Sequence, residues 1–267
     1  MQRHRVKPGS RVELARRDAG STAGFRGGKK RAAAELVRLS EQLEALQELL
    51  WAEHRHKVLV VLQGLDASGK DGTIRHVFEG VNPAGVKVAA FKVPTPEELA
   101  HDFLWRVHPK VPGRGELVIF NRSHYEDVLA ARVLELVPRE VWEPRYEQIV
   151  SFEKLLADTG TTILKFFLHI DADEQRERFQ ARIDDPTKRW KFNPGDLDTR
   201  KLWESYTAAY EDALARTATD FAPWYVVPAN KKWYRNLVVA TVLVETLEGL
   251  GMTYPPGPPG LDGLVLE

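Results

Sequence analysis

The amino-acid sequence of 267 residues contains no cysteine, which excludes disulfide bonds, thiolate metal sites and thiol nucleophiles. Its 38 Lys and Arg residues balance its 38 Asp and Glu residues, so no overall charge attracts the chain to nucleic acid or to a membrane surface. A site for a polyanion must therefore be a local cluster of basic residues.

Long apolar segments are also missing. No apolar run approaches the length of about 18 residues that indicates a membrane-spanning helix, and the basic N-terminus lacks the apolar centre of a signal peptide. We therefore expect a cytoplasmic protein with no membrane or nucleic-acid partner. The hydrophobic content of 43% and the charged content of 28% are ordinary for a globular enzyme.

A glycine-rich loop, GLDASGK at residues 64–70, follows an apolar run and precedes a helical pattern. Glycine, four residues, glycine and lysine is the spacing of a phosphate-binding loop, whose backbone amides wrap an anion at the start of a helix. A chance glycine turn is the alternative, but both spacing and context match the motif. We expect the phosphates of a ligand to contact this segment, which contains Gly64, Ala67, Ser68, Gly69, Lys70, Asp71 and Gly72.

Two carboxylates distinguish this loop from the common motif. The residue after the lysine is normally Ser or Thr, whose hydroxyl contacts magnesium, but here it is Asp71. A negative charge suits the start of a helix, so we expect Asp71 to cap it. Asp66 lies inside the loop, where a carboxylate facing phosphates needs a cation between them. Asp66 is therefore a candidate magnesium ligand, with a hydrogen bond to the local backbone as the alternative.

Short apolar segments alternate with helical patterns along the chain. The expected strands are residues 58–62, 86–91, 117–120, 162–170 and 224–227, and the expected helices are residues 73–79, 97–107, 125–137, 144–159, 172–182, 197–218 and 234–250. This alternation predicts a mainly parallel sheet with helices on both faces. Ligands of such sheets bind at the carboxyl edge of the strands.

One domain over residues 32–250 is expected between two irregular ends. Residues 1–31, rich in Arg, Lys and Gly, are expected to form a flexible basic arm, which is solvated or touches an anionic ligand. Residues 251–267, with four prolines and four glycines, are expected to form a tail. Between these ends, the first expected helix spans residues 32–56. Its apolar stripe packs on the domain's own core or on a second subunit, and consists of Leu36, Leu39, Leu43, Leu46 and Leu50.

A second candidate site follows the third predicted strand, in GELVIFNRSHYEDV at residues 115–128. Phosphate-loop kinases usually have a metal-binding aspartate here, but this strand ends at Asn121. An amide oxygen carries no charge, so we expect Glu126 or Asp127 to hold the metal instead. Adjacent residues do not share a helical face, so only one of the two is expected to do so. Arg122 is expected to point at the phosphates, with a surface ion pair as the alternative.

A basic loop follows the fourth predicted strand and its helix. In nucleotide kinases, a mobile basic loop at this place closes over the phosphates and excludes water. A solvated charged turn is the alternative. We expect a lid over about residues 178–200, whose phosphate-binding cations are Arg178, Arg182, Lys188 and Arg189.

Three stretches carry a resemblance to a known family. They are GLDASGKDGT at residues 64–73, FKVPTPEELAHDFLWRVHPKVPGRGELVIFNRSHYEDVL at 91–129 and DDPTKRWKFNPGDL at 184–197. Together they resemble the family-2 polyphosphate kinases, phosphate-loop enzymes that move phosphoryl groups between inorganic polyphosphate and nucleotides. The resemblance covers about residues 32–250 and implies a P-loop kinase-like three-layer α/β/α fold, with a mainly parallel five-stranded sheet and a helical lid.

The resemblance also implies roles for individual residues. It makes Asp66 and Asp127 the carboxylates that position magnesium, with manganese as an alternative metal. It makes Lys70 and Arg122 cations for the phosphate chain, and Arg182 a lid arginine.

The motif at residues 121–127 indicates a branch of the family. Many members have aspartate where this chain has Asn121, and the version NRSHYED resembles the branch that accepts AMP as well as ADP. In this branch Glu126 is implied in the use of monophosphates. Family members also tend to form homodimers or homotetramers, which is implied here too.

We therefore hypothesise reversible, direct in-line transfer of a phosphoryl group from polyphosphate to AMP or ADP, giving ADP or ATP, with GMP and GDP as further acceptors. A polyphosphate chain needs a long basic groove, for which we expect Lys92, Arg106, His108 and Lys231. One competing reading is an ATP-dependent nucleoside monophosphate kinase, which would lack the 91–129 stretch. The other is a non-enzymatic P-loop module that binds nucleotides or polyanions.

Overall fold

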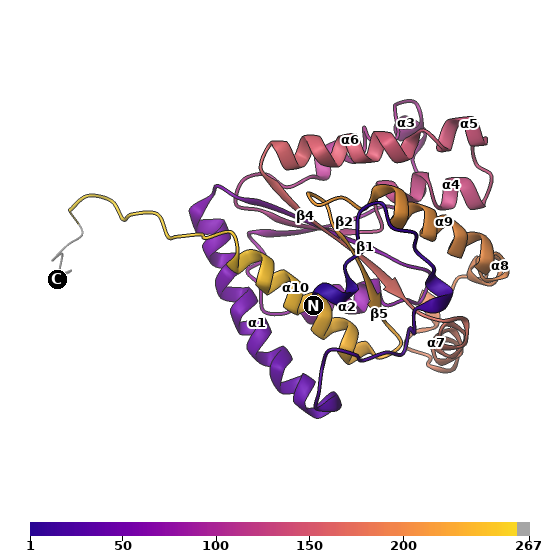
Figure 1. The fold of residues 1–267 in the computed structure, drawn as a ribbon, viewed down its shortest axis with the longest axis horizontal. Coiled ribbons are helices and arrows are strands. Elements are labelled where there is room, and N and C mark those ends of the chain that lie inside the picture. The colour runs from indigo at the N-terminus through magenta and orange to yellow at the C-terminus, as the bar shows by residue number, and fades with distance from the viewer. Residues whose placement is uncertain (261–267) are drawn as a thin grey trace.

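The computed structural model describes residues 1–260 and is built around a five-stranded sheet (Figure 1). Its strands are β1 (Lys57–Gln63), β2 (Val86–Ala90), β3 (Leu117–Asn121), β4 (Thr161–His169) and β5 (Trp224–Pro228). All neighbouring strands are parallel, and their order is β2-β3-β1-β4-β5. Every predicted strand is confirmed, with each end within one residue of its expected position.

A hydrophobic core lies on each face of the sheet, because successive residues of a strand point in opposite directions. Val58, Val60 and Leu62 of β1 belong to one core, and Leu59 and Val61 to the other. All five side chains are fully buried. A strand covered on both faces is apolar at every position, which explains the uninterrupted apolar run before the glycine-rich loop.

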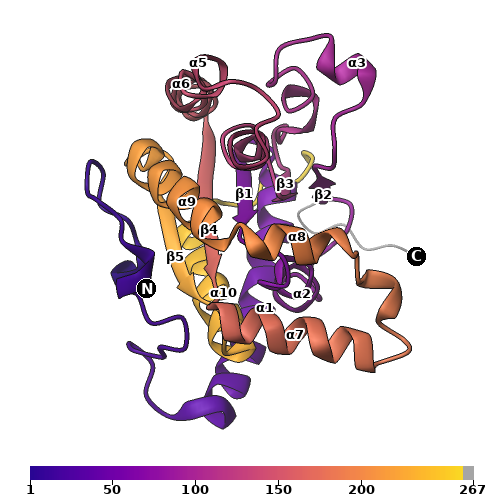
Figure 2. The ribbon, with the colours of Figure 1, turned by 90° about the vertical axis from the view of Figure 1, so that its right-hand side faces the viewer.

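Helices cover both faces and complete three layers (Figures 1 and 2). One face carries α1 (Gly28–Glu53), α2 (Lys70–Val77) and α10 (Lys232–Glu248), and the other carries α6 (Arg145–Asp158) and α9 (Trp203–Thr217). The predicted three-layer α/β/α fold with a mainly parallel sheet is therefore confirmed.

The remaining helices lie in the connections between these elements. The α-helices are α3 (Pro96–Leu99), α4 (Ala130–Val133), α5 (Arg139–Trp142), α7 (Ala172–Asp184) and α8 (Gly195–Lys201). The 3-10 helices are η1 (Gln2–His4), η2 (Leu14–Arg16), η3 (His108–Lys110), η4 (His124–Asp127) and η5 (Arg189–Lys191). In Figure 1, α7 and α8 lie at the same edge of the molecule, in the region where the lid was predicted.

Two predicted helices are much shorter than expected. The helix expected over residues 97–107 ends at Leu99, and Asp102 Oδ1 then accepts a hydrogen bond of 2.9 Å from the Leu104 amide. Such local side-chain bonds compete with helical pairing. The helix expected over residues 125–137 is replaced by η4 and α4, because the chain first forms a 3-10 turn capped by a side chain.

Residues 1–27 pack on the domain, so the prediction of a flexible arm is wrong. Val6, Val12 and Leu14 are at most 3% exposed. The Val6 amide donates to the carbonyl of Trp224 in β5 at 2.8 Å, and the segment runs beside β5 (Figure 2). These apolar residues are spread among Arg and Lys, so the overall composition of the segment concealed them.

The leucine stripe of α1 packs on the domain's own core. Leu39, Leu43 and Leu50 are at most 2% exposed, and they share a hydrophobic core with residues of α10. Of the two alternatives for the stripe, packing on the domain is the one observed.

The C-terminal segment follows α10 and extends away from the body (Figure 1). Residues 251–258 have no regular secondary structure and residues 259–260 form a turn. The rest of the predicted tail, residues 261–267, lies outside the described residues. Among residues 1–260, none of the helices is both long and apolar enough to cross a membrane.

Leu14→Ala tests the packing of the N-terminal segment. The variant should lower the free energy of unfolding by about 2–4 kcal/mol, because it removes a buried side chain and leaves a cavity. Lys7 is exposed in the same segment, so Lys7→Ala is the control and should change stability by less than about 0.5 kcal/mol. Urea unfolding measures both variants. Equal stability of Leu14→Ala and the wild type would favour a flexible arm after all.

Candidate active site

The glycine-rich loop joins β1 to α2 at the carboxyl edge of the sheet. Gly64 has φ of +152° and Gly69 has φ of +102°, values that other residues rarely adopt. A Cβ at position 64 would clash with Ser68, and one at position 69 would clash with Arg235. Both glycines are therefore required by backbone conformation and by close packing, as the phosphate-loop motif predicted.

Lys70 begins α2 and is only 8% exposed. Its Nζ donates hydrogen bonds to the carbonyl of Gly64 at 2.6 Å and to that of Leu65 at 3.3 Å. Burial lowers the pKa of Lys70 to about 8; the Arg122 guanidinium adds to the decrease and Asp66 opposes it. The ammonium group is therefore fixed within the loop, where the motif places the cation for the outer phosphates.

Two arginines support the loop from α7 and α10. Arg178 Nη1 donates to the carbonyls of Ala67 at 2.9 Å and Ser68 at 3.0 Å, and Arg235 Nη1 donates to the Ser68 carbonyl at 3.3 Å. Arg235 is 2% exposed, and burial, with the nearby Arg178 charge, lowers its pKa to about 9. The sequence did not place Arg235 at the loop, because nothing in α10 shows which turn faces it.

Arg122 links two carboxylates at the end of β3. Its Nη2 contacts Asp66 Oδ1, and its Nη1 donates to Glu126 Oε2 at 3.2 Å. The negative charge of Glu126, and then that of Asp66, raises the pKa of Arg122 against the effect of burial. Arg122 has φ of +61°, a left-handed conformation that is uncommon for a residue other than glycine. The strand end is thus bent so that the guanidinium meets the loop.

Asn121 and Asp71 form a pair across the site. Asn121 Nδ2 donates to Asp71 Oδ1 at 2.6 Å. Asp71 lies in the first turn of α2, whose N-cap is Gly69 and has no capping side chain, so the expectation that Asp71 caps the helix is wrong. An aspartate at position 121 would face Asp71 with a second negative charge. The two departures from the common motif therefore compensate each other.

A cavity of about 1190 Å³ opens over the loop, the end of β3 and the segment predicted to be a lid. Its ten basic residues are Lys70, Arg75, Lys92, Arg122, Arg178, Arg182, Lys188, Lys191, Lys232 and Arg235. Its six acidic residues are Glu41, Glu44, Asp66, Asp71, Glu79 and Asp196. The net charge of the chain is zero, so this cavity is a local basic cluster of the kind that a polyanion requires.

The structure brings most of the predicted site residues to this cavity, but not all of them. The predicted residues that line it are Asp66, Ala67, Gly69, Lys70, Asp71, Gly72, Lys92, Asn121, Arg122, Arg178, Arg182 and Lys188. The predicted residues outside the lining are Gly64, Ser68, Arg106, His108, Glu126, Asp127, Arg189 and Lys231. Gly64 and Ser68 form the buried part of the loop itself, whereas His108 and Lys231 are exposed elsewhere.

Asp127 contacts a different pair of arginines from Asp66. Its Oδ1 accepts from Arg145 Nη1 at 3.3 Å, and its Oδ2 lies 3.9 Å from Arg106 Nη2. Burial raises the pKa of Asp127, although both arginines oppose this increase. Arg106 is therefore a buried partner of Asp127 and not a cation on the cavity surface. The contact with Arg145 could not be predicted from local spacing, because this arginine begins α6, beyond α4 and α5.

The segment predicted to be a lid contributes a carboxylate that the sequence analysis did not single out. Asp196 of α8 lines the cavity. Burial raises its pKa, and the negative charge of Asp66, which lines the same cavity, adds to this increase. Spacing within the lid could not reveal this, because it depends on the position of α8 relative to the loop.

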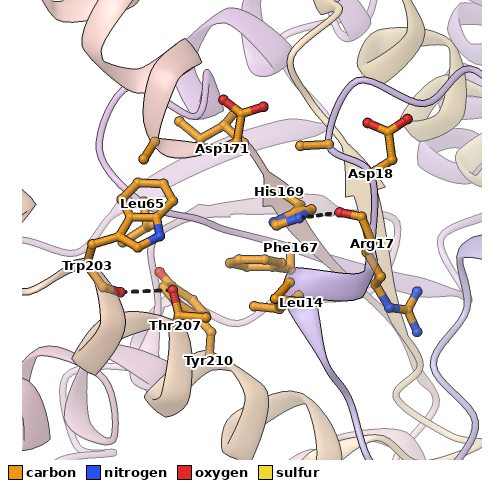
Figure 3. Close-up of a pocket in the computed structure, with 14 residues that line it drawn as sticks. Leu14, Arg17, Asp18, Leu65, Phe167, His169, Asp171, Trp203, Thr207 and Tyr210 are labelled. Carbon is orange, nitrogen blue, oxygen red and sulfur yellow. Dashed lines mark hydrogen bonds between the residues drawn. The ribbon is translucent and has the colours of Figure 1, made fainter.

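A second cavity, of about 290 Å³, lies between α9, the end of β4 and residues 14–19 (Figure 3). One of its walls is Leu65 of the glycine-rich loop, and its aromatic walls are Phe167, His169, Trp203 and Tyr210. His169 Nε2 is hydrogen-bonded to the carbonyl of Arg17 at 2.9 Å. The N-terminal segment therefore extends to the neighbourhood of the active-site loop.

Asn121→Asp tests the pairing of Asn121 with Asp71. Two carboxylates at this separation raise the pKa of one of them, so the variant is destabilised above that pKa and recovers as the pH falls below it. We expect its midpoint of thermal unfolding to fall by about 2–4 °C near pH 8 and by less near pH 5.

The exchanged variant Asp71→Asn/Asn121→Asp restores one amide and one carboxylate and is the matched control. Its thermal midpoint should follow that of the wild type at both pH values. A pH-independent melting difference for Asn121→Asp would contradict the pairing.

Comparison with known proteins gives one consistent result. The family model for Polyphosphate kinase 2 (PPK2) matches residues 27–253. The AMP/ADP-polyphosphate phosphotransferase of Meiothermus ruber is 61% identical over 267 residues and 100% of both chains. The ADP-polyphosphate phosphotransferase of Rhodopseudomonas palustris is 48% identical over 84% of this chain and 82% of its own length.

A solved structure agrees with this result. The crystal structure of Polyphosphate Kinase 2 from Arthrobacter aurescens TC1 has a TM-score of 0.94 and 43% sequence identity, and the match covers 98% of this chain and 93% of that one. Sequence, fold and the phosphate-loop site thus lead to the same assignment. The chain belongs to the polyphosphate kinase 2 family.

Proposed function

We propose that this protein transfers a phosphoryl group reversibly between inorganic polyphosphate and nucleotides, with AMP and ADP as acceptors and ADP and ATP as products. The observation that carries the proposal is one basic cavity of about 1190 Å³ shared by the phosphate loop, Arg122 and the lid. Typical small-molecule pockets have about 300–1,000 Å³, so this cavity has room for a nucleotide and part of a phosphate chain. The named activities of the relatives support these substrates.

The residues around the cavity suit direct in-line transfer. The acceptor phosphate oxygen is already anionic, so no general base is needed, and catalysis depends on alignment and charge neutralisation. Lys70 and Arg122 lie at the loop, while Arg182 and Lys188 line the cavity from the lid. Their positive charges would offset the repulsion between two polyanionic substrates. Lys92 lies on the same cavity and is proposed to contact the polyphosphate chain.

Magnesium is the proposed cofactor, with manganese as an alternative. Polyphosphate kinases are generally metal-dependent. Asp66 faces the cavity, and Asp127 Oδ2 is buried with no hydrogen-bond partner among residues 1–260. Magnesium usually takes one or two carboxylates and completes its shell with water and phosphate oxygens, so Asp66, which lines the cavity, suits it directly. Asp127 lies outside the cavity lining, between Arg145 and Arg106, and is proposed as the second ligand through this Oδ2 atom. A bound ion would neutralise phosphate charge beside Lys70.

Glu126 is proposed to support the use of AMP. It accepts a hydrogen bond from Arg122, and its Oε1 is buried without a partner in the described part of the chain. Glu126 therefore helps to fix the position of the Arg122 guanidinium relative to AMP, which is shorter than ADP by one phosphate. GMP and GDP are proposed as further acceptors, and a homodimer or homotetramer as the assembly.

Phosphorus NMR tests the function in one mixture of polyphosphate, magnesium and AMP, ADP or GDP. We expect the signal of the internal polyphosphate phosphates to fall as the chain loses its terminal groups. The signals of the β and γ phosphates of the products should grow at the same time. Products that form only when ATP replaces polyphosphate as donor would instead establish a nucleoside monophosphate kinase. Tight binding of polyphosphate with no change in any signal would establish a binding module.

Asp66→Asn and Asp127→Asn test the proposed carboxylates. Each variant should lower kcat by about a hundredfold or more, because losing the position of the metal costs about 3 kcal/mol in the transition state. The control is Asp158→Asn, whose side chain is exposed at the end of α6 and pairs only with Lys154 among the described residues. Steady-state rates with saturating polyphosphate measure all three. Wild-type turnover in both test variants would contradict the assignment.

A further inference from the structure

An ion pair is completely buried beneath the turn that carries Glu126 and Asp127. Lys165 of β4 and Glu153 of α6 are both 0% exposed, and Lys165 Nζ donates to Glu153 Oε2 at 2.5 Å. Burial alone would favour a neutral Glu153, but the Lys165 ammonium and His124 hold the pKa of its carboxyl below the ordinary value. An apolar pair of similar size is usually at least as stable in a core. Stability therefore does not explain why this position is charged.

Two consecutive residues connect the ion pair to the active-site turn. Tyr125 OH accepts a hydrogen bond from Lys165 Nζ at 2.9 Å and lies 2.9 Å from Glu153 Oε1. His124 Nε2 lies 3.3 Å from the same Glu153 oxygen. Both rings are 0% exposed, and they form the first half of η4, whose second half is the acidic pair of the site.

The turn held in this way follows the strained residue Arg122. A left-handed conformation at a residue other than glycine persists only when the surrounding structure fixes it. On one side, the Arg122 amide donates to the carbonyl of Leu62 in β1 at 3.1 Å. On the other side, Ser123 Oγ accepts from Gln63 Nε2 at 3.1 Å and from the Tyr125 amide at 3.2 Å. Tyr125 is thus the point at which the buried pair restrains the strained strand end.

We propose that Lys165 and Glu153 are positioning residues for phosphoryl transfer. By holding His124 and Tyr125, the pair keeps Arg122 in its left-handed conformation, with its guanidinium between the loop and the turn. The catalytic role of this ion pair rests on the proposed function. Loss of the ion pair should affect kcat more than KM. Lys70 and the lid cations attract the substrates, and their positions do not depend on the turn.

The double variant Lys165→Met/Glu153→Leu tests the proposal. It removes both charges with little change in volume, and so avoids the unpaired buried charge that either single variant would leave. We expect kcat to fall by about 10- to 100-fold, as small misplacements of catalytic groups do, with KM for ADP and polyphosphate within about twofold of the wild type. Tyr125→Phe, which removes the hydroxyl between pair and turn, should give a smaller decrease in kcat.

A matched control separates positioning from stability. Leu43 of α1 is fully buried in the core on the other face of the sheet, so Leu43→Ala should lower the thermal midpoint without changing kcat at a temperature well below it. A folded double variant with wild-type kcat would overturn the proposal, and so would an equal loss of kcat in Leu43→Ala.

Hydrogen exchange gives a readout that does not depend on activity. In the double variant, amides of residues 122–128 should exchange about tenfold faster, while those of residues 64–70 keep their wild-type rates. Unchanged exchange in the turn would overturn the proposal. If the wild type itself transfers no phosphoryl group, the proposed function fails, and the exchange rates alone decide whether the ion pair holds the turn.

Discussion

The contact of Arg122 with Asp66 and Glu126 is the constraint on which the site depends. It joins the phosphate loop after β1 to the turn after β3, two segments that the parallel sheet places next to each other. Without the guanidinium, two carboxylates would face each other beside a site for phosphates, where like charges repel strongly. Asp66 and Glu126 can therefore lie close to each other beside this site because Arg122 is fixed between them.

The fold could be predicted where a single physical requirement dominates. Strands covered on both faces must be apolar throughout, so β1 and β4 were found to within one residue of each end. Helical periodicity was less reliable near polar residues, since it does not register side-chain bonds such as that of Asp102 to the Leu104 amide. Composition failed for residues 1–27, where a few apolar side chains decide the packing. Average charge says little about a segment that contributes only a few buried contacts.

The site was predictable only as far as local spacing determines it. The loop lysine and Arg122 follow from their places at two strand ends, and both line the cavity. By contrast, Arg235 reaches Ser68 across 167 positions of the chain, and no spacing rule describes such a contact. The same is true of Asp196, which lines the same cavity as Asp66 only because α8 returns to the loop. Local motifs identify where phosphates bind, whereas the tertiary fold decides which distant charges stand around them.

Asn121 and Asp71 show why a motif has to be read as a set of contacts. Taken one at a time, a lost strand-end aspartate and a lost loop hydroxyl both suggest a weakened metal site. In the structure the amide donates to the carboxylate, so Asn121 removes the repulsion that Asp71 would meet from an aspartate at position 121. Compared with the common motif, the negative charge is absent from the strand end and present in the first turn of α2, where the helix dipole favours it. The charge near the phosphates is thereby conserved while its position changes, which leaves Asp66 as the carboxylate inside the loop.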